Sequence, residues 1–463
     1  MRLPSLLQAL VGTAAATAVT NTTNTTAAAA AAAVPQQQPQ QAQAQQIQLP
    51  LHTQSRWIMD ASNTRVKMRC INWAGHGEAN VPEGLHQAPL ESIADFVRDQ
   101  GFNCVRLTYS IDHALDPHVP VRDSFRAASA YSGVAVETLD GLYAQVATHN
   151  PDLAGGRGSN LTDGNGWWNK AEVYVADNSR YFDTEAWLDG IEAMATWARA
   201  QPGVAAMSLR NEMREVPVLQ GLDDAWYTYV TQGAERVHGA NPDVLVVIGG
   251  KLSATDLSMV RVKDLDFSGW AGKHVWEMHA YSFTVNFPRP PLFGCESVQA
   301  LYGLFDGFLL EQGQSFTAPL MVTEFGVGMQ GGPNHGGISD KDNEYLECIV
   351  EWMKNNDADW ALWALQGTYY VRDGQAGYDE GWGLINRDWN GVRNPEFLPL
   401  IADLFKAYVV IIDFDTYGTQ QPSKGPFPPN TYFEWLQRPD IIQKINAKGR
   451  FEACPNAPGE CCG

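Results

Sequence analysis

Two largely apolar runs of strand length, each leading to a glutamate, constrain the fold of this chain more than any other feature. Residues 203–209 are followed by three polar residues that end in Glu212, and residues 319–323 are followed directly by Glu324. Such runs are typical of strands buried on both faces of a parallel sheet. In a parallel barrel, the C-terminal ends of the strands face the catalytic mouth, so the pattern predicts two carboxylates facing one another there. A single glutamate of this kind could equally form a structural ion pair with Arg210, and the repetition is what favours a site.

Strands and helices alternate from Arg56 to about residue 405, which favours a single-domain α/β fold, the (β/α)8 TIM barrel, over an open sheet. Residues 56–60 and 65–70 predict an N-terminal hairpin that closes the bottom of the barrel. No Gly-x-Gly-x-x-Gly follows an apolar run, so a dinucleotide-binding fold is poorly supported. Helical periodicity predicts helices over residues 89–100, 184–201, 223–239, 297–312 and 341–355.

The third strand of the barrel is the place where this pattern fails. Between the second strand, 103–109, and the strand before Glu212, the chain runs through the glycine-rich residues 150–158 with no apolar run. We therefore expect the third βα unit to be missing or truncated, as a mis-joined coding segment would leave it. The expected result is either a breach between the second and fourth strands or a loose bridge made by residues 154–160.

The two ends of the chain predict an organisation in four parts. A positive start, a short apolar run and small residues predict a signal peptide over 1–19, and Thr-, Ala- and Gln-rich sequence predicts disorder over 20–50. The barrel would occupy 51–411, and 412–463 would form an irregular tail. Asn-x-Thr acceptors agree with a secreted, extracellular glycoprotein and lie at Asn21, Asn24 and Asn160.

The composition of the chain indicates which kinds of binding partner are unfavourable. The 463 residues carry 52 acidic and 32 basic side chains, a net charge of −20, which argues against nucleic acid and anionic membranes as partners. We expect a monomer that acts on a neutral substrate. The 15 Trp residues either fill the core or present flat apolar faces to sugars.

Seven cysteines are an odd number for a secreted protein. Cys70 and Cys104 lie in apolar runs, where we expect small core residues, whereas the other five could form bridges of a connectivity that the sequence does not fix. No cluster of Cys and His has the spacing of metal ligands, so we predict no metal and no cofactor.

Four motifs occur in a fixed order and carry a resemblance to a known family. They are Phe-Asn-Cys-Val-Arg-Leu at 102–107, Leu-Arg-Asn-Glu at 209–212, His-Ala-Tyr at 279–281 and Thr-Glu-Phe-Gly at 323–326. Together they resemble the cellulase-type family-five glycoside hydrolases, which are retaining enzymes on a (β/α)8 barrel. Residues 163–168 and 363–370 look like a secreted fungal and plant branch of that family. The resemblance implies that Glu212 is the acid/base and Glu324 the nucleophile.

The chemistry of a retaining glycosidase explains the other candidate residues. Glu324 must be ionised, and Arg106 at the end of the second strand is the candidate cation beside it, although a plain structural ion pair would explain the same residue. Asn211 can hydrogen-bond the sugar 2-hydroxyl. By resemblance, His279 and Tyr281 hold the sugar and Glu324 in place. Trp363 is expected to form a stacking floor under the sugar, with barrel packing as the alternative.

These observations predict a secreted retaining glycosidase that cleaves β-linked glucan in the manner of a cellulase or endoglucanase. A β-mannanase, or a glycosidase acting on shorter oligosaccharides or glycolipids, is an alternative that the subsite residues leave open. From another class, the chain could be a catalytically impaired carbohydrate-binding homologue. The presence of both glutamates argues against that last alternative.

Overall fold

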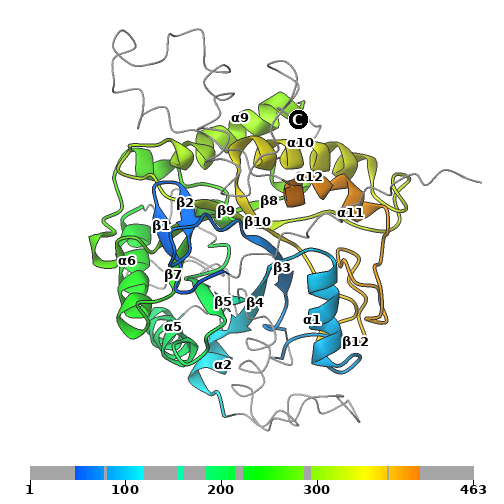
Figure 1. Cartoon of the computed structure of the whole chain (residues 1–463), viewed down its shortest axis with the longest axis horizontal. Helices are drawn as coiled ribbons and strands as arrows, with labels where there is room; N and C mark the ends of the chain where they lie inside the picture. The colour runs from blue at the N-terminus through cyan, green and yellow to red at the C-terminus, as the bar shows by residue number, and fades with distance from the viewer. Residues whose placement is uncertain are drawn as a thin grey trace, which may run out of the picture. The chain divides into compact units, whose positions relative to one another are not determined.

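Eight parallel strands close into a barrel (Figure 1). The computed structural model describes residues 47–77, 81–118, 154–159, 168, 183–213, 223–285, 294–372 and 375–406. All of them lie in the unit Gln46–Gly463. The barrel strands are β3 (Arg69–Trp73), β4 (Cys104–Ser110), β5 (Ala154–Ser159), β6 (Val204–Ser208), β7 (Leu245–Gly249), β8 (His274–Ala280), β9 (Leu320–Phe325) and β10 (Asp359–Leu362). They pair in this order, and β10 pairs with both β9 and β3, which confirms the predicted barrel.

Helices follow the strands and cover the outside of the barrel. The α5 helix begins where the Asp183 side chain accepts a hydrogen bond from the Ala186 N–H, and it buries Trp187, Ile191 and Met194 at helical spacing. The helices are α1 (Leu90–Asp99), α2 (Ile111–Leu115), α5 (Thr184–Ala198), α6 (Asp223–Ala240), α7 (Lys251–Ala254), α8 (Ser282–Val285), α9 (Cys295–Phe305), α10 (Asp340–Asn356), α11 (Phe397–Leu400) and α12 (Ala402–Lys406), with 3-10 turns η2 (Ser258–Arg261), η3 (Ser268–Trp270) and η4 (Gly307–Leu310).

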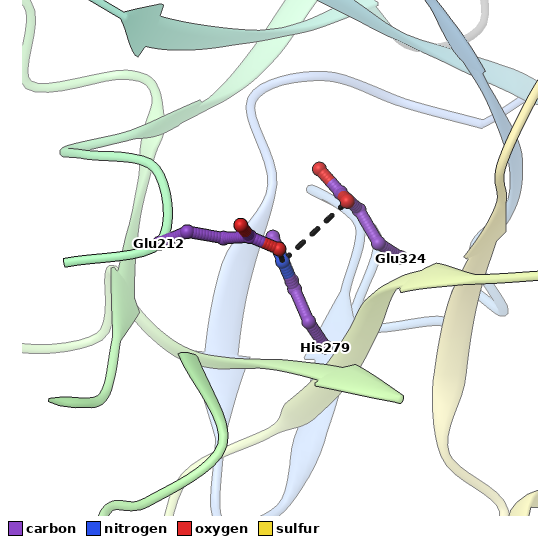
Figure 2. A group of neighbouring side chains, drawn as sticks. All are labelled: Glu212, His279 and Glu324. Atoms are coloured by element: carbon purple, nitrogen blue, oxygen red, sulfur yellow. Dashed lines mark hydrogen bonds and ion pairs between the residues drawn. The ribbon is translucent and has the colours of Figure 1, made fainter. Parts of the chain in front are cut away.

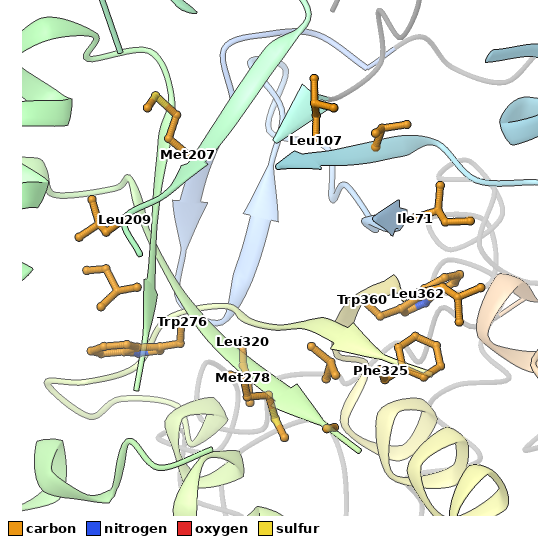
Figure 3. Packing of buried hydrophobic residues seen from close by; sticks show 14 of the residues in the cluster. Ile71, Leu107, Met207, Leu209, Trp276, Met278, Leu320, Phe325, Trp360 and Leu362 are labelled. Carbon is orange, nitrogen blue, oxygen red and sulfur yellow. The ribbon is translucent and has the colours of Figure 1, made fainter. Parts of the chain in front are cut away.

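Strand residues point alternately outward and inward, and the outward set forms the main core. Ile71, Leu107 and Trp276 belong to a large buried cluster between strands and helices (Figure 3). The intervening residues Cys70, Cys104 and Val275 belong to a second buried cluster. Because side chains on a strand alternate between its two faces, this second cluster lies inside the barrel.

A two-stranded hairpin closes the bottom of the barrel, as the sequence predicts. Its arms are β1 (His52–Gln54) and β2 (Trp57–Met59), and Ile58 packs into the apolar cluster inside the barrel. The arms begin earlier than expected. The segment after β2 adds only the single antiparallel bridge between Met59 and Arg65 before the chain enters β3. A separate antiparallel pair lies late in the chain and consists of β11 (Val371–Arg372) and β12 (Gln375–Ala376).

The expectation that the third strand is missing is wrong. The segment predicted to bridge the gap loosely does bridge it, but as a regular strand: Ala154–Ser159 pairs with β4 from Val105 to Ser110 and with β6 from Val204 to Ser208, so the structure has no breach. Sheet closure depends on backbone N–H and C=O groups, which glycine carries as well as any residue, so an apolar run is not required. The helical part of this unit would fall in 160–182, where the structure describes only Trp168.

Two disulfides join cysteines of the described residues, and one of them differs from the sequence-based expectation. Cys70 and Cys104 are bonded to one another rather than being independent core residues, because register places them opposite one another on β3 and β4 with Cα atoms 4.4 Å apart. Cys295 and Cys348 join α9 to α10. The predicted signal peptide, the glycosylation acceptors and the tail lie outside the described residues. No helix within the described ranges is long and apolar enough to cross a bilayer.

Candidate active site

The inward face of two strands leads from the apolar floor of the barrel to its mouth. On β8, Val275 belongs to the apolar cluster inside the barrel, and Glu277 and His279 follow at strand spacing. On β4, Cys104 belongs to the same cluster and Arg106 follows two residues later. Arg106 and Glu277 therefore lie one layer above the floor, and His279 lies one layer closer to the mouth.

Glu212 and Glu324 meet at this mouth, with His279 between them (Figure 2). A carboxyl oxygen of each glutamate and Nδ1 of His279 all lie within 4.8 Å of one another. His279 Nδ1 lies 2.9 Å from Oε1 of Glu212 and 3.5 Å from Oε2 of Glu324. The side chain of Glu212 is 20% exposed and that of Glu324 is 5% exposed. The structure thus brings together the two carboxylates that the sequence predicts to face one another.

Glu324 receives hydrogen bonds from two of the predicted residues. Arg106 Nη1 donates to Oε1 at 2.9 Å, and the Tyr281 hydroxyl donates to Oε2 at 3.0 Å. Burial alone would lower the pKa of Arg106, but the carboxylates of Glu277 and Glu324 hold that pKa above its ordinary value. A buried, permanently charged guanidinium beside Glu324 favours the ionised carboxylate.

The carboxylates around His279 favour its protonated form. Burial alone would lower its pKa, but the negative charge of Glu324 and hydrogen bonds with Glu212 and Glu277 raise the pKa of His279 to about 9. Among the described residues, Glu212, His279 and Glu324 have the composition of a metal-binding group. Nδ1 of His279 lies 2.9 Å from Oε1 of Glu212, the length of a hydrogen bond, so hydrogen bonding explains this grouping without a metal.

Sequence reasoning missed Glu277, the carboxylate at the centre of this network. It is fully buried, and its Oε1 accepts hydrogen bonds from Arg106 Nη2 at 2.7 Å and His279 Nε2 at 3.1 Å. Burial alone would raise its pKa, but the charge of Arg106 and the contacts with His279 lower the pKa of Glu277 to about 2. A glutamate two residues before His279 on one strand must share its face, and that spacing was the available signal.

The backbones of Asn211 and Trp363 both lie close to the catalytic candidates. Asn211 is buried and directly precedes Glu212. Trp363 is half-buried and directly follows β10, and its N–H donates to the carbonyl of Phe325, next to Glu324, at 2.7 Å.

An aromatic surface continues outward from Glu324. The ring of Tyr281 stacks on that of Phe283 with centroids 4.9 Å apart, and the ring of Trp382 meets Tyr281 edge-on at 5.8 Å. Phe283 is 55% exposed although it is a large apolar side chain. Flat aromatic faces of this kind suit the apolar faces of pyranose rings.

Comparison with known proteins identifies the family. Residues 59–368 match the cellulase family, glycosyl hydrolase family 5. A glycosyl hydrolase 5 family protein of Chamaecyparis obtusa is 32% identical over 421 residues, which cover 84% of this chain and 70% of that protein.

Solved structures share the fold at much lower identity. A hyperthermophilic endocellulase from the archaeon Pyrococcus horikoshii is 16% identical, with a TM-score of 0.59 over 78% of this chain and 100% of that chain. The catalytic domain of the major endoglucanase from Xanthomonas campestris pv. campestris is 17% identical, with a TM-score of 0.59 over 77% and 100%. The family match over most of the barrel and the plant relative together make this chain a glycosyl hydrolase of family 5.

Proposed function

We propose that this chain is a secreted, retaining β-glycosidase that cleaves β-linked glucan chains by double displacement. The observation that carries the proposal is the placement of carboxyl oxygens of Glu212 and Glu324 within 4.8 Å of one another. Retaining enzymes hold their two carboxyl groups about 5–5.5 Å apart, whereas inverting enzymes separate them by about 6.5–9.5 Å to admit a water molecule. One oxygen of each carboxyl group lies within 4.8 Å of an oxygen of the other, which supports the closer, retaining arrangement.

In the first displacement, Glu324 attacks the anomeric carbon while Glu212 donates its proton to the glycosidic oxygen, so the leaving sugar departs as an alcohol. In the second, Glu212 takes a proton from water, and the resulting nucleophile releases the sugar from Glu324. Arg106 and Tyr281 favour the ionised form of Glu324 between turnovers because both donate hydrogen bonds to it. The greater exposure of Glu212 suits the group that must exchange protons with water.

The remaining predicted residues hold the substrate. Asn211 would hydrogen-bond the sugar 2-hydroxyl beside Glu212, and His279 would orient Glu212 through Nδ1. Trp363 would stack beneath the sugar bound next to Glu324.

Several observations support a neutral β-glucan as the substrate and the outside of the cell as the place of action. Structures of the same fold are described as endocellulases, some of them as complexes with cellotetraose. The net charge of −20 disfavours polyanionic substrates, and residues 1–19 have the pattern of a signal peptide.

Substitution of the two carboxyls tests the assignment. Glu324→Gln and Glu212→Gln should each remove most activity toward a β-glucan while leaving the melting temperature near that of the wild type. Azide should restore part of the turnover of Glu324→Ala, because a small anion can replace the missing nucleophile. The matched control is Glu347→Gln, which changes an exposed carboxyl on α10.

The stereochemistry of the first product gives a separate test. Proton NMR of the reaction in progress should detect the β-anomer before mutarotation. An inverted first product, or near-normal rates in either Gln variant, would refute the double displacement. A panel of β-glucans and mannans decides between a cellulase-like and a mannanase-like specificity, and the N-terminus of the protein recovered from culture medium tests secretion.

A further inference from the structure

We propose that Glu277 is a positioning residue for the proposed reaction, which holds Arg106 and His279 against Glu324 as a pair of cations. The inference rests on the proposed role of Glu324. Glu277 itself is fully buried and so lies out of reach of a sugar. It acts on the reaction only through the two side chains that it anchors.

Glu277 accepts hydrogen bonds both from residues of the active site and from other residues of the barrel strands. Oε1 accepts hydrogen bonds from Arg106 Nη2 at 2.7 Å, from His279 Nε2 at 3.1 Å and from the Thr323 hydroxyl at 2.8 Å. Oε2 accepts a hydrogen bond from the Ser208 hydroxyl. One carboxylate thus satisfies donors from the strands β4, β6, β8 and β9.

Arg106 and His279 each contact Glu277 through one nitrogen atom and Glu324 through another. Arg106 binds Glu277 through Nη2 and Glu324 through Nη1, and His279 faces Glu277 with Nε2 and Glu324 with Nδ1. Arg106 therefore hydrogen-bonds both carboxylates, whereas His279 hydrogen-bonds Glu277 and Glu212, and its Nδ1 lies 3.5 Å from Glu324. This geometry fixes the guanidinium in plane and the imidazole ring in rotation, which a single contact would not do.

Charge balance explains why a carboxylate is needed in this layer. With Glu212 protonated and ready to act as the acid, the buried charges are two anions, Glu324 and Glu277, and two cations, Arg106 and His279. Without the charge of Glu277, two buried cations would face one anion. The imidazolium can relieve that excess by losing its proton, whereas the guanidinium cannot. Glu324 would then lose one of its two cations.

The Glu277→Gln variant tests this inference. We expect kcat/KM to fall at least tenfold, and the acid limb of its pH profile to move to higher pH by about one unit, because Glu324 protonates more readily beside fewer cations. The loss should appear in kcat more than in KM, since Glu277 does not touch the sugar. Ser208→Ala is the matched control: it removes one hydrogen bond to the same carboxylate without changing charge, and its acid limb should stay in place.

A second measurement on the unsubstituted protein remains decisive if Glu277→Gln does not fold. Nitrogen-15 NMR of the histidine rings should find His279 doubly protonated at pH 7, and neutral His279 would overturn the proposal. So would a folded Glu277→Gln variant with wild-type kcat and an unmoved acid limb. If Glu324→Gln and Glu212→Gln are inactive while Glu277→Gln behaves as the wild type, only the positioning role fails. Activity in the first two variants would refute the proposed function instead.

Discussion

Glu83 offers a quantitative test of the electrostatics around the mouth of the barrel. It lies in the segment after β3 and is 1% exposed. Its Oε2 accepts a hydrogen bond from the N–H of Tyr370 at 2.7 Å, which ties this segment to the one after β10. Burial raises the pKa of Glu83 to about 8, and the Tyr370 hydrogen bond and the charge of Arg372 only partly oppose that effect.

The direction of the pH effect follows from the raised pKa. Below an ordinary pKa of 4.5, Glu83 is protonated in both the folded and the unfolded chain. Between pH 4.5 and about 8, only the unfolded chain ionises, so the free energy of unfolding falls as pH rises. At about 1.36 kcal/mol per pH unit, the loss reaches about 5 kcal/mol. That is a large share of a typical stability of about 5–15 kcal/mol.

The Glu83→Gln variant should remove this loss, because the amide oxygen still accepts from Tyr370 and no proton is taken up. Denaturant unfolding at pH 5 and at pH 8 measures the free energies of both proteins. Other groups titrate in the same range, so the quantity of interest is the difference between variant and wild type at each pH. The variant should be close to the wild type at pH 5 and more stable by several kcal/mol at pH 8. Glu347→Gln, an exposed carboxyl, should follow the wild type throughout. An unchanged difference between the two pH values would refute the argument.

Two further predictions concern the walls of the site. Phe283→Ala should raise KM for a polysaccharide severalfold in steady-state assays, whereas Leu304→Ala, on an equally exposed apolar residue, should not; equal effects would contradict a stacking surface. Gly326→Ala should lower activity at least tenfold, because a Cβ there would lie 2.2 Å from the carbonyl oxygen of Trp363. Gly239→Ala on α6 has open space around the new Cβ and should keep full activity and a slightly higher melting temperature.

Much of the fold was predictable because apolar runs and helical periodicity report burial directly. The runs before Glu212 and Glu324 are strands of the barrel, and parallel strands bring their C-terminal ends to one rim, so the meeting of the two carboxylates follows from topology. Their catalytic roles stay predictions. The strand Ala154–Ser159 was missed because it pairs through backbone groups, and its glycine-rich sequence has no apolar pattern that would indicate a strand.

Other features depend on contacts between residues far apart in the chain. The contacts of Glu277 do not follow from the sequence of its own strand, because its partners Arg106 and Ser208 come from other strands. The pairing of Cys70 with Cys104 depends on the register of β3 against β4, which the sequence of either strand alone does not encode. Register and long-range pairing are thus what the sequence left open.

The disulfide between Cys70 and Cys104 has a consequence for how this protein is produced. Both sulfurs lie in the apolar floor beneath the active site, with the two residues 2% and 3% exposed. A dissolved oxidant or reductant reaches such a bond only while the barrel is open, so the cross-link between β3 and β4 forms fastest before the floor packs. Expression in a reducing cytoplasm would assemble the same barrel with two thiols in its base, and later exposure to air would oxidise them slowly. The compartment of synthesis therefore decides which covalent form of the enzyme is obtained.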